Sequence, residues 1–247
     1  MSAKTLYLHI PFCKSKCSYC DFVSFATRRD DPLMEAYAGA LAFQIDEAAE
    51  TGLIEAPMTA YIGGGTPSHL GEGIVGLAER AASFGSLSEL TVEANPEFLT
   101  FDLSLRLKES GVSCLSIGVQ SLDDAELAAL GRIHDAKTAL QALNCAIELG
   151  FDISADLMCA IPLQTSSSWQ GTLEGVLGTG VSHVSVYPLM IEEGTAFARA
   201  VAAGKQDVPD DGDEALRMEE ADALLSSRGF ARYEVASYAK EGRACLH

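Results

Sequence analysis

Six short runs rich in β-branched residues recur along this chain, and segments with helical periodicity separate them. The runs cover residues 5–10, 58–62, 89–93, 114–118, 152–157 and 183–187. The longest helical segment, residues 136–149, places its apolar side chains on one face and stops before Gly150, a typical residue just past a helix end. Strands that alternate with helices of this length predict an α/β fold with a parallel sheet and right-handed crossovers.

Two parallel-sheet architectures fit this alternation. Six repeats can curl into an open, partial (β/α)6 barrel, whereas the alternative is a flat, doubly wound sheet. Polar residues follow several successive strands, as if they converged on one mouth, and in β/α barrels this end of the strands carries the active site. We therefore expect the partial barrel.

The pattern changes after Pro188. A polar, acidic stretch precedes residues 213–228, which predict an amphipathic helix, and residues 231–238 predict a strand with no partner after it. We expect residues 1–203 to form the barrel core. Residues 204–247 are expected to form a linker and the start of an unfinished C-terminal α+β subdomain.

Three closely spaced cysteines follow the first predicted strand. Cys13, Cys17 and Cys20 lie on a loop that Pro11 begins, because proline cannot continue a central strand. Three thiolates can hold three irons of a four-iron four-sulfur (4Fe-4S) cluster and leave the fourth iron open to a small molecule. Zinc is the alternative, but zinc sites typically add a second cysteine pair, and the next cysteine, Cys114, stands alone. The spacing therefore favours a cluster.

Composition limits the partners and the compartment. The net charge of −18, from 17 basic and 35 acidic residues, argues against nucleic acid, because binding to phosphates rests on Lys and Arg. No apolar run reaches the ~18 residues that a membrane-spanning helix needs, and the first strand begins too soon after Met1 to leave room for a secretory leader. Seven scattered cysteines do not look like a disulfide framework. We expect a cytoplasmic protein.

Polar residues gather after the later predicted strands. Residues 63–67 include three glycines that let a ligand approach the backbone closely, and Glu93 ends the third strand. Gln120 follows the fourth strand, and Asp156 ends the fifth. Arg132 follows a helix end and can bind a carboxylate. Together with the cysteines, these residues suit a zwitterionic ligand that carries a ribose.

At this point the chain resembles a known superfamily. The C-x-x-x-C-x-x-C spacing after the first strand is similar to that of the radical S-adenosylmethionine (SAM) proteins. Further motifs resemble the branch that contains oxygen-independent coproporphyrinogen III oxidase (HemN) and the heme chaperone HemW. They cover residues 7–13, 63–67, 93–96, 118–121 and 131–134.

The resemblance implies the cofactors and their contacts. The implied cluster ligands are Cys13, Cys17 and Cys20. SAM would chelate the open iron through its amino and carboxylate groups, with Gly64 at its methionine end and with Tyr7 and Glu93 in contact with it. The remaining matching positions line the same mouth and contact a second SAM in the oxidase; they are Tyr19, Gly65, Thr66, Gln120, Arg132 and Asp156.

Within the branch, the chain is most similar to the chaperone. Phe22 stands where the oxidase has a further cysteine, and the long N-terminal extension of the oxidase is not matched here. Residues 192–195 and 233–238 also resemble later segments of the chaperone. The expected function is thus a HemW-like protein that binds heme and delivers it to an acceptor hemoprotein. Whether SAM is turned over stays open at this point.

Two other functions remain alternatives. One is oxidative decarboxylation of coproporphyrinogen III, and the other is a non-catalytic zinc or scaffold role. The resemblance implies a reductant such as flavodoxin or ferredoxin, and an acceptor that can be membrane-associated although the chain has no transmembrane segment. It also implies a C-terminal truncation, because the chaperone normally continues after Cys245 with a further domain.

Overall fold

The parallel strands of the central sheet follow one another in chain order. The computed structural model describes residues 3–207 and 210–247. Its central parallel strands are β1 (Thr5–Ile10), β4 (Thr59–Gly64), β5 (Glu89–Ala94), β6 (Cys114–Gln120), β7 (Asp152–Cys159) and β8 (His183–Pro188). Each strand pairs in parallel with the next one along the chain. A doubly wound sheet would reverse its order at a switch point, so this order excludes the flat alternative and agrees with the expected singly wound α/β fold.

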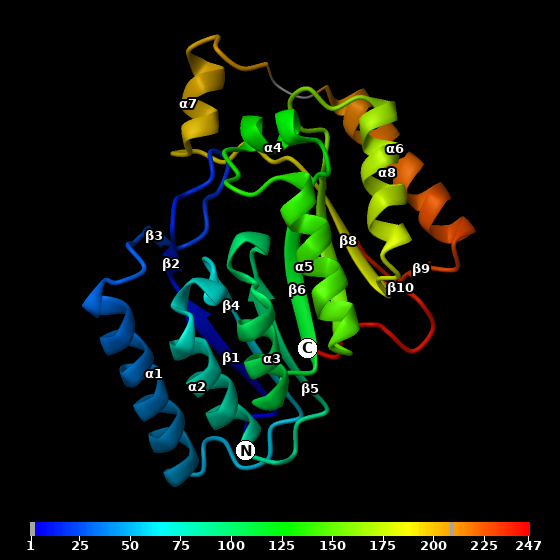
Figure 1. Cartoon of the computed structure of the whole chain (residues 1–247). Coiled ribbons are helices and arrows are strands. Elements are labelled where there is room, and N and C mark those ends of the chain that lie inside the picture. The colour runs from blue at the N-terminus through cyan, green and yellow to red at the C-terminus, as the bar shows by residue number, and fades with distance from the viewer. Residues whose placement is uncertain (1–2, 208–209) are drawn as a thin grey trace.

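Helices connect these strands and cover one face of the sheet (Figure 1). They are α1 (Pro32–Glu50), α2 (Glu72–Ala82), α3 (Phe101–Glu109), α4 (Asp124–Leu130), α5 (Ala136–Glu148), α6 (Ser166–Gly178), α7 (Ala196–Ala202) and α8 (Asp211–Ser227). Local chemistry sets their ends. The Asp31 side chain accepts a hydrogen bond from the Leu33 N–H at the start of α1, and Gly131 adopts the left-handed conformation that ends α4.

The two faces of the strands differ in chemistry. Alternate strand residues such as Ile62, Val92 and Ile117 are buried in the main hydrophobic core with the helices. Their neighbours point to the other face, and these include Tyr61, Thr91, Glu93, Ser116, Ser154, Asp156, His183 and Ser185. Buried parallel strands are usually apolar on both faces. The inner face here is instead polar, and its side chains hydrogen-bond to one another across strands.

The C-terminal part extends the same sheet. β10 (Ser237–Ala239) pairs antiparallel with β8 and with β9 (Ala231–Arg232). The expectation of one unpartnered strand over residues 231–238 is therefore wrong, because the chain reverses at residues 233–236 and forms a short hairpin. The N–H of Ser237 donates to the Glu234 carbonyl within this turn. The boundary between residues 203 and 204 stays a prediction.

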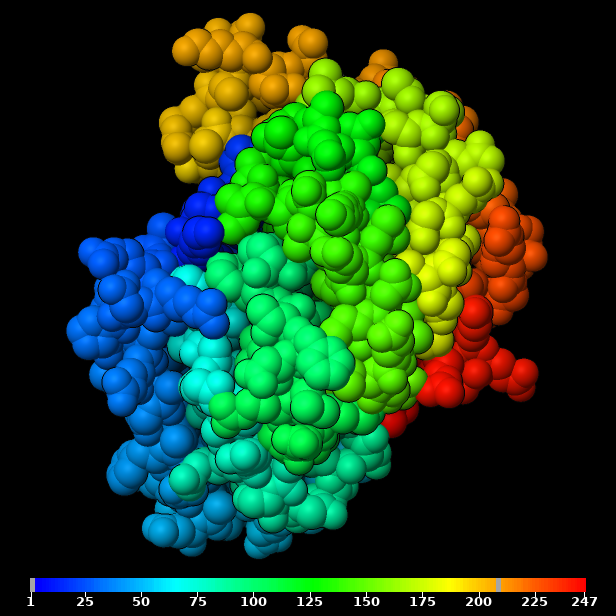
Figure 2. Space-filling view, in the orientation of Figure 1, coloured from blue at the N-terminus to red at the C-terminus, as the bar shows by residue number. Residues whose placement is uncertain are grey.

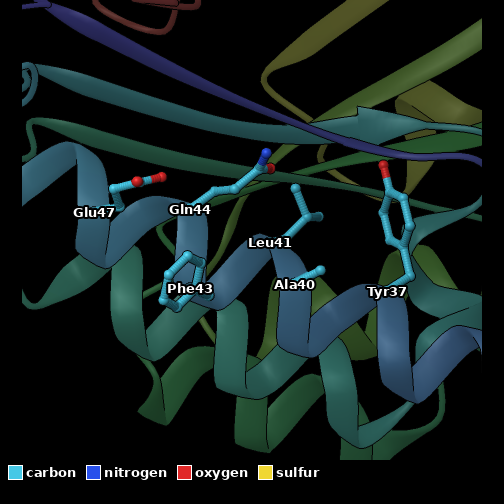
Figure 3. Close-up of a pocket in the computed structure, with 6 residues that line it drawn as sticks. All are labelled: Tyr37, Ala40, Leu41, Phe43, Gln44 and Glu47. Atoms are coloured by element: carbon cyan, nitrogen blue, oxygen red, sulfur yellow. The ribbon is translucent and has the colours of Figure 1, made fainter.

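A groove of about 460 Å³ lies along α1. Figure 3 shows its lining side chains, which are Tyr37, Ala40, Leu41, Phe43, Gln44 and Glu47. The Tyr37 hydroxyl donates to the carbonyl of His9 on β1, at the edge of the sheet. The groove is therefore at the side of the fold, and the polar residues identified above lie elsewhere.

Candidate functional site

The cysteine loop lies between two short strands. β2 (Phe12–Cys13) and β3 (Phe25–Ala26) form a separate parallel pair, which holds the two ends of the loop together. The Ser18 N–H and hydroxyl both donate to the Leu130 carbonyl at the end of α4. The Phe197 N–H of α7 donates to the Ser18 carbonyl. Three hydrogen bonds to the rest of the fold thus fix a loop that has no helix or long strand of its own.

The thiols of this loop have polar partners. The Thr66 hydroxyl donates to Cys13 Sγ at 3.4 Å, and the Arg132 guanidinium donates to Cys17 Sγ at 3.6 Å. Burial raises the pKa of the Cys20 thiol, and negative charge on Cys17 and Cys13 would raise it further. Donors aimed at the sulfur atoms suit thiolates, which are the form that binds iron.

The three thiols do not surround a single point. Over residues 3–207 and 210–247, no three His, Cys, Asp or Glu side chains are arranged to hold one metal ion. In a four-iron cluster each thiolate binds a different iron, so its ligands need not converge as those of a mononuclear zinc site do. The donor set is therefore compatible with a cluster.

The glycine run at the end of β4 packs its backbone against this loop. A Cβ on Gly65 would lie 2.9 Å from both Cys13 Sγ and the Phe12 carbonyl oxygen. Gly64 has a φ of +127°, which L side chains rarely adopt, and a Cβ there would approach the Ile10 carbonyl at 2.8 Å. Only glycine fits at these positions, so the run forms a close backbone cradle beside the cysteines.

A carboxylate from the next strand meets the cradle. Glu93 accepts hydrogen bonds from the Tyr61 hydroxyl at 2.8 Å and from the Gly64 N–H at 2.9 Å. Burial raises the pKa of Glu93, although both donors oppose the shift. Tyr7 stacks on Tyr61 with ring centroids 6.1 Å apart. Tyr61 thus brings Tyr7, Gly64 and Glu93 together, and their contact with SAM stays a prediction.

Asp156 lies deeper on the polar face than expected. β7 continues to Cys159, so Asp156 is inside the strand and not at its end. It accepts hydrogen bonds from the hydroxyls of Ser116 at 2.6 Å and Ser154 at 3.1 Å. Burial raises the pKa of Asp156 to about 7. Its recorded side-chain partners are these serines, and none of the cysteines is among them.

Arg132 links the cysteine loop to the ends of β5 and β6. It donates to the Asn95 side chain and to the Gly118 carbonyl, both at 2.9 Å, in addition to Cys17. Burial alone would raise the pKa of nearby Glu97, but the His134 hydrogen bond and the Arg132 charge hold it below its ordinary value. Arg132 thus keeps its positive charge next to the thiols.

Two further predicted residues lie at the same end of the sheet. Gln120 ends β6 with a φ of +68° where the pairing of β6 with β7 shifts register. Such strained backbone is concentrated at functional sites. Tyr19 packs beside Leu130, and burial raises its pKa. Tyr19 lies on the cysteine loop itself, and Thr66, Gly65 and Arg132 approach the loop from other segments.

Sequence reasoning missed the residues that hold the predicted ones in place. Tyr61 binds Glu93, Asn95 binds both Arg132 and Thr66, and Ser116 binds Asp156. The one available signal was the alternation along β4, where Tyr61 stands between the buried residues Ala60 and Ile62.

The C-terminal residues cross the polar face at the opposite end of the strands. Both carboxylate oxygens of Glu89 are engaged there, one by the Cys245 thiol and one by the Leu246 N–H at 2.9 Å. The His247 ring stacks on Tyr61 with centroids 5.0 Å apart and bonds to Thr59 Oγ1 at 3.0 Å. Figure 1 shows this end of the chain beside β5 and β6.

Known proteins are similar to this chain in sequence and in fold. A model of the radical SAM superfamily matches residues 7–175. The chain is 36% identical over 250 residues to the heme chaperone HemW of Mycobacterium tuberculosis, covering 98% of this chain and 64% of that protein. HemW of Bacillus subtilis is 35% identical over 251 residues, with 99% of this chain and 65% of that protein covered.

Solved structures agree with the sequence matches. Coproporphyrinogen III oxidase (HemN) of Escherichia coli, described as a radical SAM enzyme, superposes with a TM-score of 0.84 at 25% identity. The match covers 98% of this chain and 56% of the oxidase. The chain thus spans a little under two thirds of the length of these HemW proteins. Its cysteine loop, its singly wound sheet and the matched model together show that the chain belongs to the radical SAM superfamily, with sequence similarity to HemW.

Proposed function

We propose that this chain is the SAM-binding part of a HemW-like heme chaperone, which binds a 4Fe-4S cluster, SAM and heme and passes heme to an acceptor hemoprotein. The observation that carries the proposal is the contact of the glycine cradle with Cys13, in a chain 36% identical to a HemW protein. At Gly64 and Gly65 the cradle presents only backbone to the cysteine loop.

Different residues of the site would bind the cluster and SAM. Cys13, Cys17 and Cys20 would hold the cluster, and Arg132 would balance its negative charge through Cys17. Glu93 would accept hydrogen bonds from the amino group of SAM. Tyr61 and Gly64 would hold the Glu93 carboxylate in position for this. When bound, a cluster of this type supplies one electron to SAM.

Phe22 favours the chaperone over the oxidase. It is 62% exposed on the cysteine loop, at the position where the oxidase carries a further cysteine. Oxidative decarboxylation of coproporphyrinogen III remains the second candidate function. The same residues around the cysteine loop would bind the cluster and SAM for that reaction, and HemN shares the fold. Zinc binding is disfavoured because no second cysteine pair follows the three closely spaced cysteines.

The first experiment is anaerobic reconstitution with iron and sulfide, followed by electron paramagnetic resonance of the reduced protein with and without SAM. The parent should give a cluster signal that shifts on adding SAM, and Cys17→Ala should lose it. Cys145→Ala is the matched control, because Cys145 lies on α5 outside the cysteine loop. A Cys17→Ala protein that keeps the parent's iron content would contradict the ligand assignment.

A heme titration followed by absorbance separates the two functions. A chaperone should bind heme stoichiometrically and release no carbon dioxide from coproporphyrinogen III under anaerobic conditions. Release of carbon dioxide together with 5′-deoxyadenosine would favour the oxidase. No helix in the described ranges is both long and apolar enough to cross a membrane.

The scattered cysteines, which do not resemble a disulfide framework, support a cytoplasmic location as part of the proposal. The proposed reductant is flavodoxin or ferredoxin.

A further inference from the structure

The cysteine loop is basic in an otherwise acidic protein. Residues 11–29 contain four of the chain's 17 basic residues and one of its 35 acidic residues. The basic residues are Lys14, Lys16, Arg28 and Arg29, and all four are exposed. The remainder of the chain is therefore even more acidic than its net charge of −18 indicates. Positive charge on this surface is concentrated where the cluster ligands are.

Three of these charges are available to a partner. Lys14 has no recorded hydrogen bond or ion pair, and Lys16 uses one proton of its ammonium group on the Phe22 carbonyl. Arg29 lies near Gly71, an uncharged neighbour. Arg28 instead pairs with Asp30 in an exposed ion pair, which reduces its contribution. We call Lys14, Lys16 and Arg29 the basic rim.

Apolar side chains lie inside the rim. Phe22, Val23 and Phe25 are 62%, 70% and 63% exposed, although the chain elsewhere buries most of its phenylalanines. Figure 2 shows part of the dark-blue N-terminal segment at the surface between the orange atoms of α7 and the lighter blue of α1. Cys17 and Cys20 on this segment are only partly buried. An exposed apolar centre with a charged rim is the anatomy of a protein-docking surface.

From this juxtaposition we propose that residues 14–29 dock an acidic one-electron carrier protein of the flavodoxin or ferredoxin class. The inference rests on the proposed function, since it needs a cluster at the cysteines. Complementary charge would steer the carrier to this basic segment of an acidic protein and repel it from the acidic surface. The small area of the loop fits a transient electron-transfer contact, which buries less surface than a stable complex.

The redox step balances with one electron. The reduced carrier, a flavin hydroquinone or a reduced iron-sulfur centre, would lose one electron and the oxidised cluster would gain it. Cys17 and Cys20 are partly exposed on this loop, so docking there would place the carrier close to the cluster. The carrier then leaves in a form one electron more oxidised, and no proton or bond needs to move on this protein.

An anionic membrane is the competing occupant, because exposed aromatic and basic residues together also suit a lipid surface. The charge of the whole chain argues against it. A broad anionic surface would face many of the 35 acidic residues as well as the rim, whereas a small protein can contact the loop alone. The experiment therefore includes vesicles as a separate arm.

The test measures binding and needs no turnover. A bacterial flavodoxin and a ferredoxin are titrated against the parent chain and against the triple variant Lys14→Gln/Lys16→Gln/Arg29→Gln, from about 20 to about 200 mM salt. The parent should bind at low salt and weaken as salt rises. The triple variant should bind roughly tenfold more weakly at low salt, and its affinity should depend less on salt.

Matched controls lie at the other end of the strands. Lys4, Arg228 and Lys240 are exposed cations near the start of β1 and the C-terminal hairpin. The control variant Lys4→Gln/Arg228→Gln/Lys240→Gln has the same net charge as the test variant, so it separates the rim from overall charge. Phe22→Ser is a third variant, and it should weaken binding without changing the salt dependence.

The outcomes decide the proposal. Selective loss of carrier binding in the rim variant supports it. Equal loss in both triple variants, or a parent that binds neither carrier at low salt, overturns it. Rim-dependent binding to vesicles of phosphatidylcholine and phosphatidylglycerol, without carrier binding, overturns it in favour of a lipid surface. Heme titration of the same variants keeps the proposed function separate, because loss of the rim should leave heme binding unchanged.

Discussion

The hydroxyl of Tyr61 donates a 2.8 Å hydrogen bond to Oε1 of Glu93 on the neighbouring strand. The second carboxylate oxygen of Glu93 accepts from the Gly64 N–H. Tyr61 also stacks between Tyr7 and His247. One tyrosine therefore joins the predicted SAM contacts to the C-terminal residues on the same polar face.

Replacing Tyr61 with phenylalanine should destabilise the protein, because Glu93 would lose one of its two donors while it remains buried. Loss of a hydrogen bond to a buried acceptor costs about 1–2 kcal/mol. The measurement is the free energy of unfolding from urea denaturation of the protein without cofactors. SAM binding should weaken as well, because the orientation of the Glu93 carboxylate is no longer fixed.

Tyr37→Phe is the control for this change. Its hydroxyl also makes one hydrogen bond, to the His9 carbonyl, but this bond involves no carboxylate. Tyr37→Phe should lower the free energy of unfolding by less than Tyr61→Phe does, and it should leave SAM binding unchanged. An equal loss of unfolding free energy in the two variants would show that the hydrogen bond to Glu93 stabilises the protein no more than an ordinary one.

Gly65→Ala should prevent normal cluster assembly. The new Cβ would lie 2.9 Å from Cys13 Sγ and from the Phe12 carbonyl oxygen, so backbone atoms have to move. We expect a loss of stability on the order of 2 kcal/mol or more and a lower iron and sulfide content after reconstitution. Both quantities are measured on the same preparation.

Gly76→Ala makes the same chemical change at a position with open space. Gly76 lies inside α2, and no atom is within 4 Å of a Cβ built there. Alanine is favoured over glycine in a helix by up to ~1 kcal/mol, so this variant should be as stable as the parent or more stable. Normal cluster content in Gly65→Ala would refute the close contact.

The strands of the fold could be predicted well because each one is a local apolar run. Their ends could not. Asp156 was taken as the end of its strand, but β7 continues to Cys159 because polar side chains alternate toward the inner face. The hairpin over residues 231–239 was also missed, since residues 233–236 contain neither glycine nor proline to signal a turn.

The site was predictable where its residues are close in sequence. Cys13, Cys17 and Cys20 and the glycine run have local spacing that indicates their chemistry. Tyr61 and Asn95 reach their partners through sheet register and loop packing. Tyr61 lies opposite Thr91, two residues before Glu93. Neither segment alone contains a feature that predicts the contact between Tyr61 and Glu93.

Glu89→Gln should loosen the C-terminal residues. Glu89 offers one carboxylate oxygen to the Cys245 thiol and the other to the Leu246 N–H. The Thr91 hydroxyl donates to the same oxygen as Cys245, so Glu89 has three donors. An amide keeps one oxygen and places an NH2 group at the other. We expect the amide oxygen to stay with the two donors that share it, which leaves the Leu246 N–H without its acceptor. Hydrogen exchange at the Leu246 amide should become roughly tenfold faster. Glu109→Gln on exposed α3 surface should leave that rate unchanged, and an unaffected rate in Glu89→Gln would contradict the assignment.

Stability should fall as the pH rises, because burial raises the pKa of Asp156 to about 7 from an ordinary value of 3.8. Between these values the folded protein holds a proton that the unfolded chain has released. The stabilisation is complete below the unfolded value and is lost as the pH rises through about 7. Asp156→Asn removes this titration and keeps the size of the side chain. The unfolding free energy of the variant relative to the parent should therefore rise by about 2–3 kcal/mol between pH 5 and 8. Urea denaturation of both proteins across this range measures the difference, and parallel pH profiles would show that Asp156 ionises normally.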